Sequence, residues 1–360
     1  MDKKILLIGE ASSVHRNLTI GLAKIGYDAT DVSYGNAGRL IQSKISLQKK
    51  IPFLSQRISE NINPFLQLKN FKDYDIVQFI QYANNFNPRF GIDKYLTEFL
   101  LNRSDRKYLI ATTCDPIVRS FFKEGYKYNQ ICKECLKHDY KSTACIFDGE
   151  ANMRKILNFV GKVDGIIPTA YEYAEAYRQQ GIEKILPMIP YPIDLDTVEY
   201  KENLAKGKMK FFHGLNKYGL KGTEIISKAM DRLKSNYPND VECSIVGNVS
   251  LGDYIKLLGE ANVIVDQAYS ATYGMNGAYA MALGKVVVGG GQDIALHEMG
   301  LNSSPIIKLI PTEQGIYDSL EYVLANKTKI TDMGSSSRQF VEENHDDKKI
   351  ARRYVDVWGL

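Results

Sequence analysis

Short apolar runs alternate with amphipathic helical patterns along this chain, and the runs fall into two series. The first series occupies residues 4–8, 75–80, 107–112 and 163–168. The second occupies residues 209–214, 241–247, 262–266, 285–290 and 305–310. Continuous apolar strands between helices are typical of parallel sheets that are covered on both faces. The pattern therefore predicts an α/β chain with two doubly wound, Rossmann-like domains.

The boundary between the two series is rich in proline. Within residues 185–196, three prolines fall in a stretch of six residues. They interrupt any helix there and stiffen an extended connection between the domains. We expect the linker there, between domains at residues 1–190 and 191–340. Residues 341–360 have a helical pattern and are expected to form a C-terminal helix that packs back on a domain surface. Ligands of such sheets bind at the carboxyl ends of the strands, in the cleft that the two domains face.

Composition excludes several classes of protein. The 360 residues are 44% apolar and 24% charged, which is ordinary for a soluble chain of two domains. No run of about 18 apolar residues predicts a membrane span, and no cleavage site follows the short apolar stretch near the start. Five cysteines, an odd number, favour a reducing compartment, so we expect a cytoplasmic protein. The net charge of +4 does not indicate nucleic acid as a partner.

The positive charge is concentrated in one insertion, residues 39–72. Only Glu60 opposes its seven basic side chains, which are Arg39, Lys44, Lys49, Lys50, Arg57, Lys69 and Lys72. Apolar residues, among them Phe53 and Phe65, lie between them. A basic surface with apolar side chains suits peripheral contact with an anionic membrane at its inner face, or a lipid-linked acceptor. A solvated helical excursion that covers the first domain is the alternative.

Two loops could hold a phosphate group. After the first strand, Gly9 and small residues lead into a helix, and His15 could donate to a phosphate or a sugar hydroxyl. No GxGxxG motif is present, so a tight turn with a solvated histidine is the alternative. In the second domain a glycine-containing loop places Lys217 and Lys221 beside the positive end of a helix, where they could hold a diphosphate. Surface lysines around a turn are the alternative there.

The second domain also carries a longer motif. Lys221 and Gly222 open a helix, and residues 273–288 read YGMNGAYAMALGKVVV. This pattern resembles the group 1 glycosyltransferases of the GT-B fold, which are retaining nucleotide-sugar enzymes, and residues 191–200 resemble the linker motif of that family. The likeness is good from about residue 185 to residue 290. It implies an acceptor-binding first domain, a donor-binding second domain and chemistry that requires no metal.

The sequence departs from the family pattern at three positions. The two family glutamates align with Ala271 and Tyr279, and the family arginine is replaced by Lys217 with altered spacing. In the family the first glutamate contacts the transferred sugar and the second binds the ribose. The chain therefore resembles a divergent member that lacks both glutamates. Sugar and ribose recognition would have to come from Asp266, Asn276 or Tyr279.

These patterns give one set of site predictions. Lys217 and Lys221 would stabilise the departing diphosphate. Asp115, which ends a strand before Pro116, would either activate the acceptor or cap the following helix. The expected donor-binding residues are Gly9, His15, His213, Gly214, Gly247, Asp266, Gly274, Met275, Asn276, Gly277 and Tyr279.

A cysteine-rich segment, residues 126–149, could hold a structural metal ion. Cys132, Cys135, His138 and Cys145 have a spacing compatible with a closed tetrahedral zinc site. Free thiols or a reversible disulfide are the alternatives, because no second CxxC pair is present.

The sequence thus predicts a hexosyltransferase-like glycosyltransferase that moves a sugar from a nucleoside diphosphate to a glycan or lipid-linked acceptor, in surface polysaccharide biosynthesis. Two alternatives are a catalytically inactive protein that binds sugar nucleotides or glycans, and an enzyme similar to the UDP-sugar epimerases.

Overall fold

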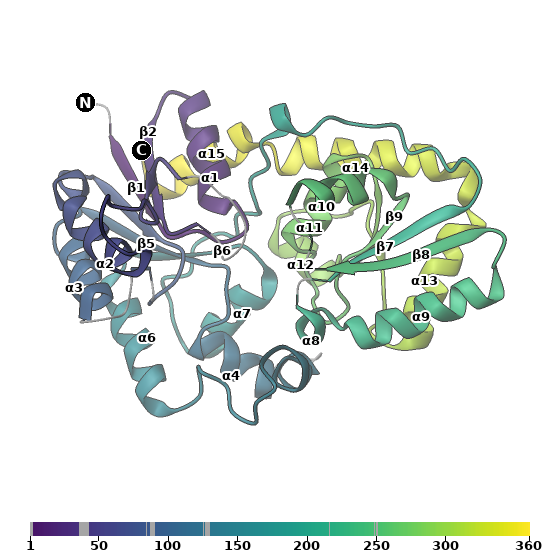
Figure 1. Ribbon diagram of the computed structural model, residues 1–360, viewed down its shortest axis with the longest axis horizontal. Helices are drawn as coiled ribbons and strands as arrows, with labels where there is room; N and C mark the ends of the chain where they lie inside the picture. The colour runs from purple at the N-terminus through teal and green to yellow at the C-terminus, as the bar shows by residue number, and fades with distance from the viewer. Residues whose placement is uncertain are drawn as a thin grey trace. The chain divides into compact units, whose positions relative to one another are not determined.

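The computed structural model describes residues 3–35, 43–83, 85–86, 91–124, 126, 130–215, 217–247, 249 and 251–360. The chain forms two compact units (Figure 1). The first unit comprises Met1–Val118, Phe147–Asp194 and Asp347–Leu360, and the second comprises Arg119–Ile146 and Leu195–Asp346.

The first unit is built on a parallel sheet of six strands in the order β3-β2-β1-β4-β5-β6. These strands are β1 (Lys4–Ile8), β2 (Asp28–Ser33), β3 (Ile45–Ser46), β4 (Ile76–Phe79), β5 (Arg106–Ala111) and β6 (Gly165–Pro168). The four strands that the apolar runs predict are all present. The pattern of apolar runs does not identify β2, because this strand contains polar residues, or β3, which is only two residues long.

Helices connect the strands of this sheet. They are α1 (Val14–Lys24), α2 (Gln56–Leu66), the short 3₁₀ helix η1 (Leu68–Phe71), α3 (Ile92–Leu101), α6 (Glu150–Lys162) and α7 (Tyr171–Gln179). Helix α4 (Pro116–Glu124) starts in the first unit and ends in the second. The last helix, α15 (Asp347–Trp358), packs against α1 (Figure 1). Gly21 of α1 has no side chain where the backbone of Asp347 touches it.

The second unit is built on a parallel sheet of five strands in the order β11-β10-β9-β7-β8. These are β7 (Met209–Leu215), β8 (Val241–Gly247), β9 (Val263–Val265), β10 (Val286–Gly289) and β11 (Ile307–Lys308). All five were predicted. The two sheets and their helices confirm the α/β fold class and two doubly wound units.

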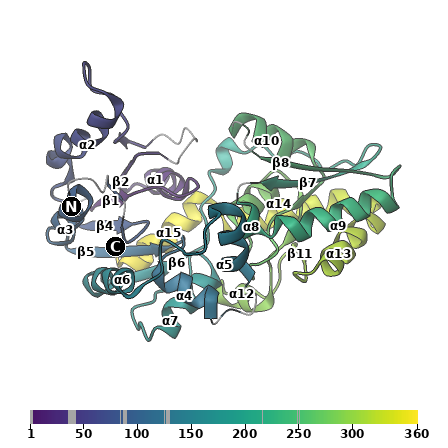
Figure 2. The same cartoon turned by 60° about the horizontal axis from the view of Figure 1, so that its bottom comes forward.

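The helices of the second unit follow its strands. They are α5 (Gln130–Glu134), the π-helical segment η3 (Cys135–Tyr140), α8 (Tyr218–Lys221), α9 (Thr223–Asn236), α10 (Leu251–Glu260), α11 (Met275–Ala282), α12 (Asp293–Glu298), α13 (Glu313–Ala325) and α14 (Ile330–Asn344). Two short 3₁₀ helices, η4 (Leu195–Thr197) and η5 (Lys327–Lys329), also belong to it. Helices α9 and α13 lie side by side in both views (Figure 2).

The units do not follow the simple boundaries at residues 190 and 340. Most of the cysteine-rich segment, expected in the first domain, packs with the second unit as part of Arg119–Ile146. The reason is a close contact, because Gly219 of α8 has no side chain where the backbone of Glu134 approaches it. Conversely, the C-terminal helix returns to the first unit, where Trp358 is fully buried.

Among the described residues, no helix has both the length and the apolar character that crossing a membrane would require.

Candidate functional site

Lys221 and Asp266 lie together at the carboxyl edge of the second sheet. Lys221 is the last residue of α8, and Asp266 directly follows β9. The Nζ atom of Lys221 is 3.5 Å from Oδ1 of Asp266, and both side chains are buried. The other carboxylate oxygen, Oδ2, accepts a hydrogen bond of 2.8 Å from the backbone N–H of Gly274, where α11 begins. The structure therefore brings three of the predicted residues together.

The glycine after Lys221 is required by the local geometry. Gly222 has a φ of 75°, in the left-handed region, and separates α8 from α9. A Cβ atom at this position would approach Ala268 and Tyr269 to 3.0 Å. The carbonyl of Lys221 also accepts a hydrogen bond of 2.9 Å from the N–H of Ala268. The Lys-Gly pair is thus fixed against the loop that follows β9.

The amino-terminal end of α11 offers backbone donors beside Lys221. Gly274 occupies the cap position and has no side chain with which to accept from the first turn, which contains Met275, Asn276 and Gly277. A Cβ atom on Gly277 would lie 3.1 Å from Oδ2 of Asp266, so this turn packs closely on the carboxylate. A helix terminus and a buried ammonium group in the same place favour an anion.

Asn276 is held by a residue that the sequence analysis missed. The hydroxyl of Tyr254, on α10, donates to Oδ1 of Asn276, and the same hydroxyl lies where a side chain on Gly214 would be. The Nδ2 group of Asn276 is buried without a hydrogen-bond partner in the described part of the chain. Gly247, at the end of β8, packs against the backbone of Leu215. Gly214 therefore makes room for Tyr254, and Asn276 keeps an amide donor for a ligand.

His213 is used inside the protein. Its Nδ1–H donates to the carbonyl of Val265 over 2.7 Å, which leaves Nε2 to accept from the hydroxyl of Thr223 at 2.9 Å. Burial lowers the pKa of His213 to about 4, and the nearby charge of Lys221 acts in the same direction. The neutral ring fixes the start of α9. The predicted donor-binding role of His213 is therefore at most indirect.

Lys217 has a different environment from Lys221. It is exposed, and its Nζ atom lies 5.1 Å from the centre of the Tyr140 ring. The N–H groups of Gly219 and Leu220 donate to the carboxylate of Asp139 over 3.3 and 3.0 Å. The start of α8, where the sequence predicted phosphate binding, therefore holds a carboxylate of the chain itself. Tyr279 is half-buried on α11.

The predicted loop of the first unit also uses its histidine internally. Gly9 has a φ of 86° at the end of β1. His15 is fully buried, its Nδ1–H donates to the carbonyl of Gly9 over 2.8 Å, and its Nε2 lies 3.3 Å from the amide of Gln78. Burial lowers the pKa of His15 to about 4. The ring is therefore neutral, and both of its nitrogens are occupied within the unit.

Glu10 is a further residue that the sequence analysis missed. It follows Gly9, and one carboxylate oxygen accepts from the N–H of Arg16 at 3.0 Å. The other oxygen is buried without a hydrogen-bond partner among the described residues. Burial raises the pKa of Glu10 to about 7, so the group can take up or release a proton near neutral pH. Its place directly after a buried strand was the available signal.

Asp115 caps a helix. Its Oδ1 accepts from the N–H of Val118 at 2.8 Å, in the first turn of α4, and its Oδ2 accepts from the hydroxyl of Tyr177 at 2.7 Å. The side chain is buried, and burial raises its pKa to about 6. Both oxygens of the predicted catalytic carboxylate thus have partners in the first unit.

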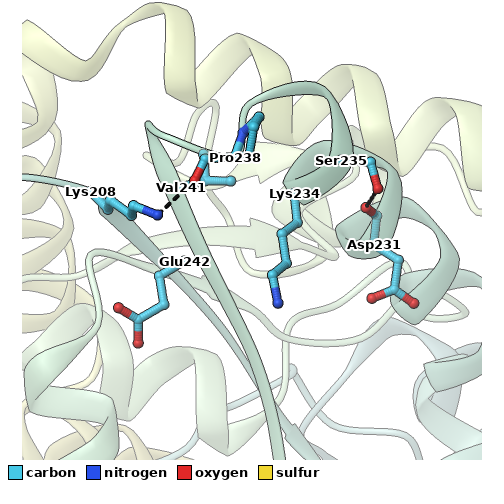
Figure 3. Close-up of a pocket in the computed structure, with 7 residues that line it drawn as sticks. All are labelled: Lys208, Asp231, Lys234, Ser235, Pro238, Val241 and Glu242. Atoms are coloured by element: carbon cyan, nitrogen blue, oxygen red, sulfur yellow. Dashed lines mark hydrogen bonds between the residues drawn. The ribbon is translucent and has the colours of Figure 1, made fainter.

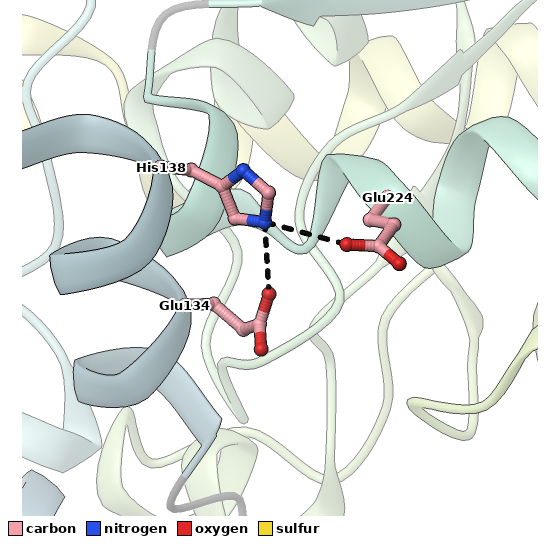
Figure 4. A group of neighbouring side chains, drawn as sticks. All are labelled: Glu134, His138 and Glu224. Carbon is pink, nitrogen blue, oxygen red and sulfur yellow. Dashed lines mark ion pairs between the residues drawn. The ribbon is translucent and has the colours of Figure 1, made fainter. Parts of the chain in front are cut away.

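The cysteine-rich segment brings different residues together than predicted. Cys132, Cys135 and Cys145 form no disulfide within the described residues, and burial raises the pKa of Cys135 to about 11. In the described ranges, the ligand atoms of these cysteines and His138 do not gather within 4.8 Å of one another. His138 faces Glu134 and Glu224 instead (Figure 4).

A hollow of about 490 Å³ lies at the opposite edge of the second sheet (Figure 3). Val241 begins β8, and Lys208 precedes β7, so the hollow is at the amino ends of the strands. It is lined by Lys208, Asp231, Lys234, Ser235, Pro238, Val241 and Glu242. The site around Lys221 lies at the carboxyl ends of the strands, where ligands of open α/β sheets bind, so this hollow is separate from it.

No protein-family model matches the chain, and no curated protein matches its sequence. Solved structures do match it over almost its whole length. Sucrose-phosphate synthase from Thermosynechococcus elongatus is 14% identical with a TM-score of 0.63, and the match covers 99% of this chain and 98% of that one. HepE from Anabaena in complex with UDP and glucose is 12% identical with a TM-score of 0.61, covering 99% of both chains.

An epimerase matches as well. UDP-GlcNAc 2-epimerase from Neisseria meningitidis bound to UDP-GlcNAc is 11% identical with a TM-score of 0.50, and the match covers 99% of both chains. At these identities the likeness concerns the fold alone. The fold of this chain is that of the GT-B proteins.

Proposed function

We propose that this chain is a glycosyltransferase that moves a sugar from a nucleoside diphosphate donor to a hydroxyl of a glycan or lipid-linked acceptor. The observation that carries the proposal is the group formed by Lys221, Asp266 and the start of α11. It places a buried cation, paired with Asp266, beside the first-turn N–H groups of α11 at the carboxyl edge of a Rossmann-like sheet. That combination suits a diphosphate.

The chemistry requires little covalent participation by the protein. Negative charge develops on the diphosphate as the bond to the sugar breaks, and groups that stabilise this charge lower the barrier. Lys221 and the first-turn N–H groups of α11 would do so without a metal ion. Asp266 holds Lys221 in position, since their side chains form an ion pair. We propose transfer with retention of configuration, as in the family that the sequence resembles.

Recognition of the sugar and the ribose must differ from the family pattern. Ala271 and Tyr279 stand where the family has glutamates. The unpaired Nδ2 group of Asn276 supports a role for this residue as a donor to a sugar or phosphate oxygen. The complexes of HepE with UDP and glucose and of the epimerase with UDP-GlcNAc suggest uridine nucleotides as the first donors to test.

The acceptor is proposed to bind to the first unit. Glu10 lies at the carboxyl end of β1 with one unpaired buried oxygen and a pKa of about 7, so it can accept a hydroxyl proton. A lipid-linked acceptor is supported by the insertion at residues 39–72, where Phe53 and Leu66 are exposed among basic residues. Arg39 lies outside the described residues. We accordingly propose a cytoplasmic protein with peripheral membrane contact, acting in surface polysaccharide biosynthesis.

Donor binding can be tested through Lys221. Removing its charge is expected to weaken the binding of UDP and UDP-sugars about tenfold or more, because hydrogen bonds to charged groups contribute about 1.5–3 kcal/mol. Lys221→Ala alone would leave Asp266 buried and unpaired, so the informative variant is Lys221→Ala with Asp266→Asn. Asp266→Asn alone keeps an acceptor for Gly274 and the charge of Lys221 but removes the ion pair that positions it, so it should weaken binding less than the double variant does. Isothermal titration measures all three.

Lys234→Ala is the matched control, because Lys234 is an exposed lysine of α9 at the hollow of Figure 3. Its donor affinity should equal that of the wild type. Unaltered affinity in the Lys221 double variant would exclude the diphosphate assignment, and a loss in Lys234→Ala would move the site to the other edge of the sheet.

Two alternatives have specific support. The missing glutamates favour an inactive protein that binds sugar nucleotides or glycans, and the likeness to an epimerase favours an epimerase-like enzyme. Incubation with UDP-glucose and UDP-GlcNAc separates them. Transfer or donor hydrolysis supports the glycosyltransferase, an epimerised nucleotide sugar supports the epimerase, and binding without turnover supports the inactive protein.

A further inference from the structure

Three side chains from two parts of the second unit converge beside the start of α9 (Figure 4). Glu134 ends α5, His138 lies on η3, and Glu224 is in the first turn of α9. Nε2 of His138 is 3.2 Å from an oxygen of Glu134 and 3.3 Å from an oxygen of Glu224. The three ligand atoms all lie within 4.8 Å of one another.

The arrangement of these atoms suits a cation at their centre. The buried Nε2 atom of His138 lies close to one carboxylate oxygen of each glutamate. It forms no hydrogen bond of acceptable geometry within the described residues. Lys137 already brings one positive charge to the edge of this group, at 3.1 Å from Glu224 and 4.0 Å from Glu134, and a divalent ion at the centre would bring a larger charge to all three ligand atoms. Metal-to-ligand distances of about 2.0–2.2 Å place neighbouring ligands of a tetrahedral ion about 3.3–3.6 Å apart. The observed nitrogen-to-oxygen distances are close to that range.

We propose that Glu134, His138 and Glu224 bind one divalent cation of the zinc class. One imidazole and two carboxylates are ligands that zinc accepts, whereas calcium and magnesium prefer oxygen alone. Three protein ligands leave a fourth position for water. The ion would link the segment Arg119–Ile146 to the first turn of α9, where Glu224 lies two residues after Gly222. This role is structural and does not depend on the proposed transfer reaction.

Two neighbouring lysines affect how tightly this site would bind a metal ion. The Nζ atom of Lys137 is 3.1 Å from the same oxygen of Glu224 that faces His138, and Lys228 pairs with the other oxygen at 3.2 Å. These two lysines hold Glu224 in place through ion pairs with both of its oxygens. Lys137 is exposed and must move away when the ion binds. The metal therefore competes with Lys137.

The test is a zinc titration of the full chain after chelator treatment, with a chromophoric competitor that reports affinity. We expect one zinc ion per chain. His138→Ala and Glu224→Gln should each weaken binding more than about 100-fold, because even the loss of an outer-shell partner costs about 10- to 100-fold. Lys137→Ala should bind up to about fivefold tighter, the scale of an exposed ion pair.

A variant in which Cys132, Cys135 and Cys145 are all alanine separates this site from a thiolate site, and it should bind zinc as the wild type does. Glu134→Gln serves as a second ligand variant if Glu224→Gln fails to fold. Three results would overturn the proposal: no stoichiometric zinc in the wild type, loss of binding in the cysteine variant, or wild-type affinity in the ligand variants.

Discussion

Asp115 shows how one buried carboxylate can serve two structural partners. It caps α4 through the N–H of Val118 and accepts from the hydroxyl of Tyr177. Burial outweighs these bonds and raises its pKa to about 6, so the ionised form costs stability at neutral pH. The lowered pKa values of His15 and His213 have the opposite effect on the pH dependence of stability. Their pKa values of about 4 mean that the stability they contribute is present above pH 6.5 and is lost as the pH falls to 4.

Asp115→Asn should keep the cap and remove the charge. The folded wild type binds more protons at Asp115 than the unfolded chain between pH 3.8 and about 6, so this group adds stability as the pH falls. The variant lacks this gain in stability, because asparagine does not take up a proton. Its free energy of unfolding relative to the wild type should fall by about 3 kcal/mol between pH 7 and pH values below 4, because two pKa units correspond to that amount. Denaturant unfolding at a series of pH values measures it.

Turnover of Asp115→Asn should stay close to that of the wild type at pH 7. A large loss of turnover with unchanged folding would instead assign Asp115 to acceptor activation.

Helix α2 and the residues before it form the most apolar exposed surface of the insertion. Phe53 is fully exposed and has a φ of 66°, which is unusual for a large side chain. Phe65 and Leu66, near the end of α2, are also exposed. Lys49 and Lys50 are exposed close by in the sequence. Apolar side chains beside lysines complement the interior and the charged surface of an anionic bilayer.

Phe53→Ser with Phe65→Ser should therefore weaken binding to vesicles that contain anionic lipid. Burying one phenylalanine contributes about 1.5–3 kcal/mol, so the loss should be about tenfold or more. Ile310→Ser is the control, since Ile310 is also apolar and exposed but lies in the second unit. Cosedimentation measures the bound fraction, and binding that does not depend on anionic lipid would refute the membrane assignment.

The first unit depends on the return of the last helix of the chain. Trp358 donates from its indole nitrogen to Gln78, whose amide faces His15, and His15 in turn donates to Gly9. Lys24 of α1 pairs with Asp194 and with Asp347, both at 2.7 Å. These contacts join all three chain segments of the first unit. The fold of this unit is therefore completed only by the last residues of the chain.

Trp358→Ala should destabilise the first unit by about 3–5 kcal/mol, the usual cost of removing a large buried aromatic side chain. Hydrogen exchange should rise in β1, β4 and α1 and remain unchanged in β7 to β10. Tyr322→Ala is the control, because Tyr322 is an exposed aromatic residue of α13. A uniform rise across both units would show that the two units unfold as one.

Features that depend on neighbouring residues can be inferred from the amino-acid sequence. Continuous apolar runs identified nine of the eleven strands in the described residues, since a strand buried on both faces must be apolar throughout. Gly222 and Gly274 marked the starts of α9 and α11, because backbone geometry at these turns is local. These signals also located Lys221 and Asp266 at the carboxyl ends of their sheet.

Only the tertiary structure decided which polar groups face inward and which meet one another. His15, His213 and Asp115 are satisfied by internal partners, while Glu10 and Asn276 each keep an atom without a partner in the part of the chain that the structure describes. The segment Arg119–Ile146 joins the second unit, where His138 meets Glu224 rather than the nearby cysteines. The physical reason is that each of these outcomes depends on contacts between distant parts of the chain, whereas spacing in the sequence constrains only residues on the same turn, strand or loop.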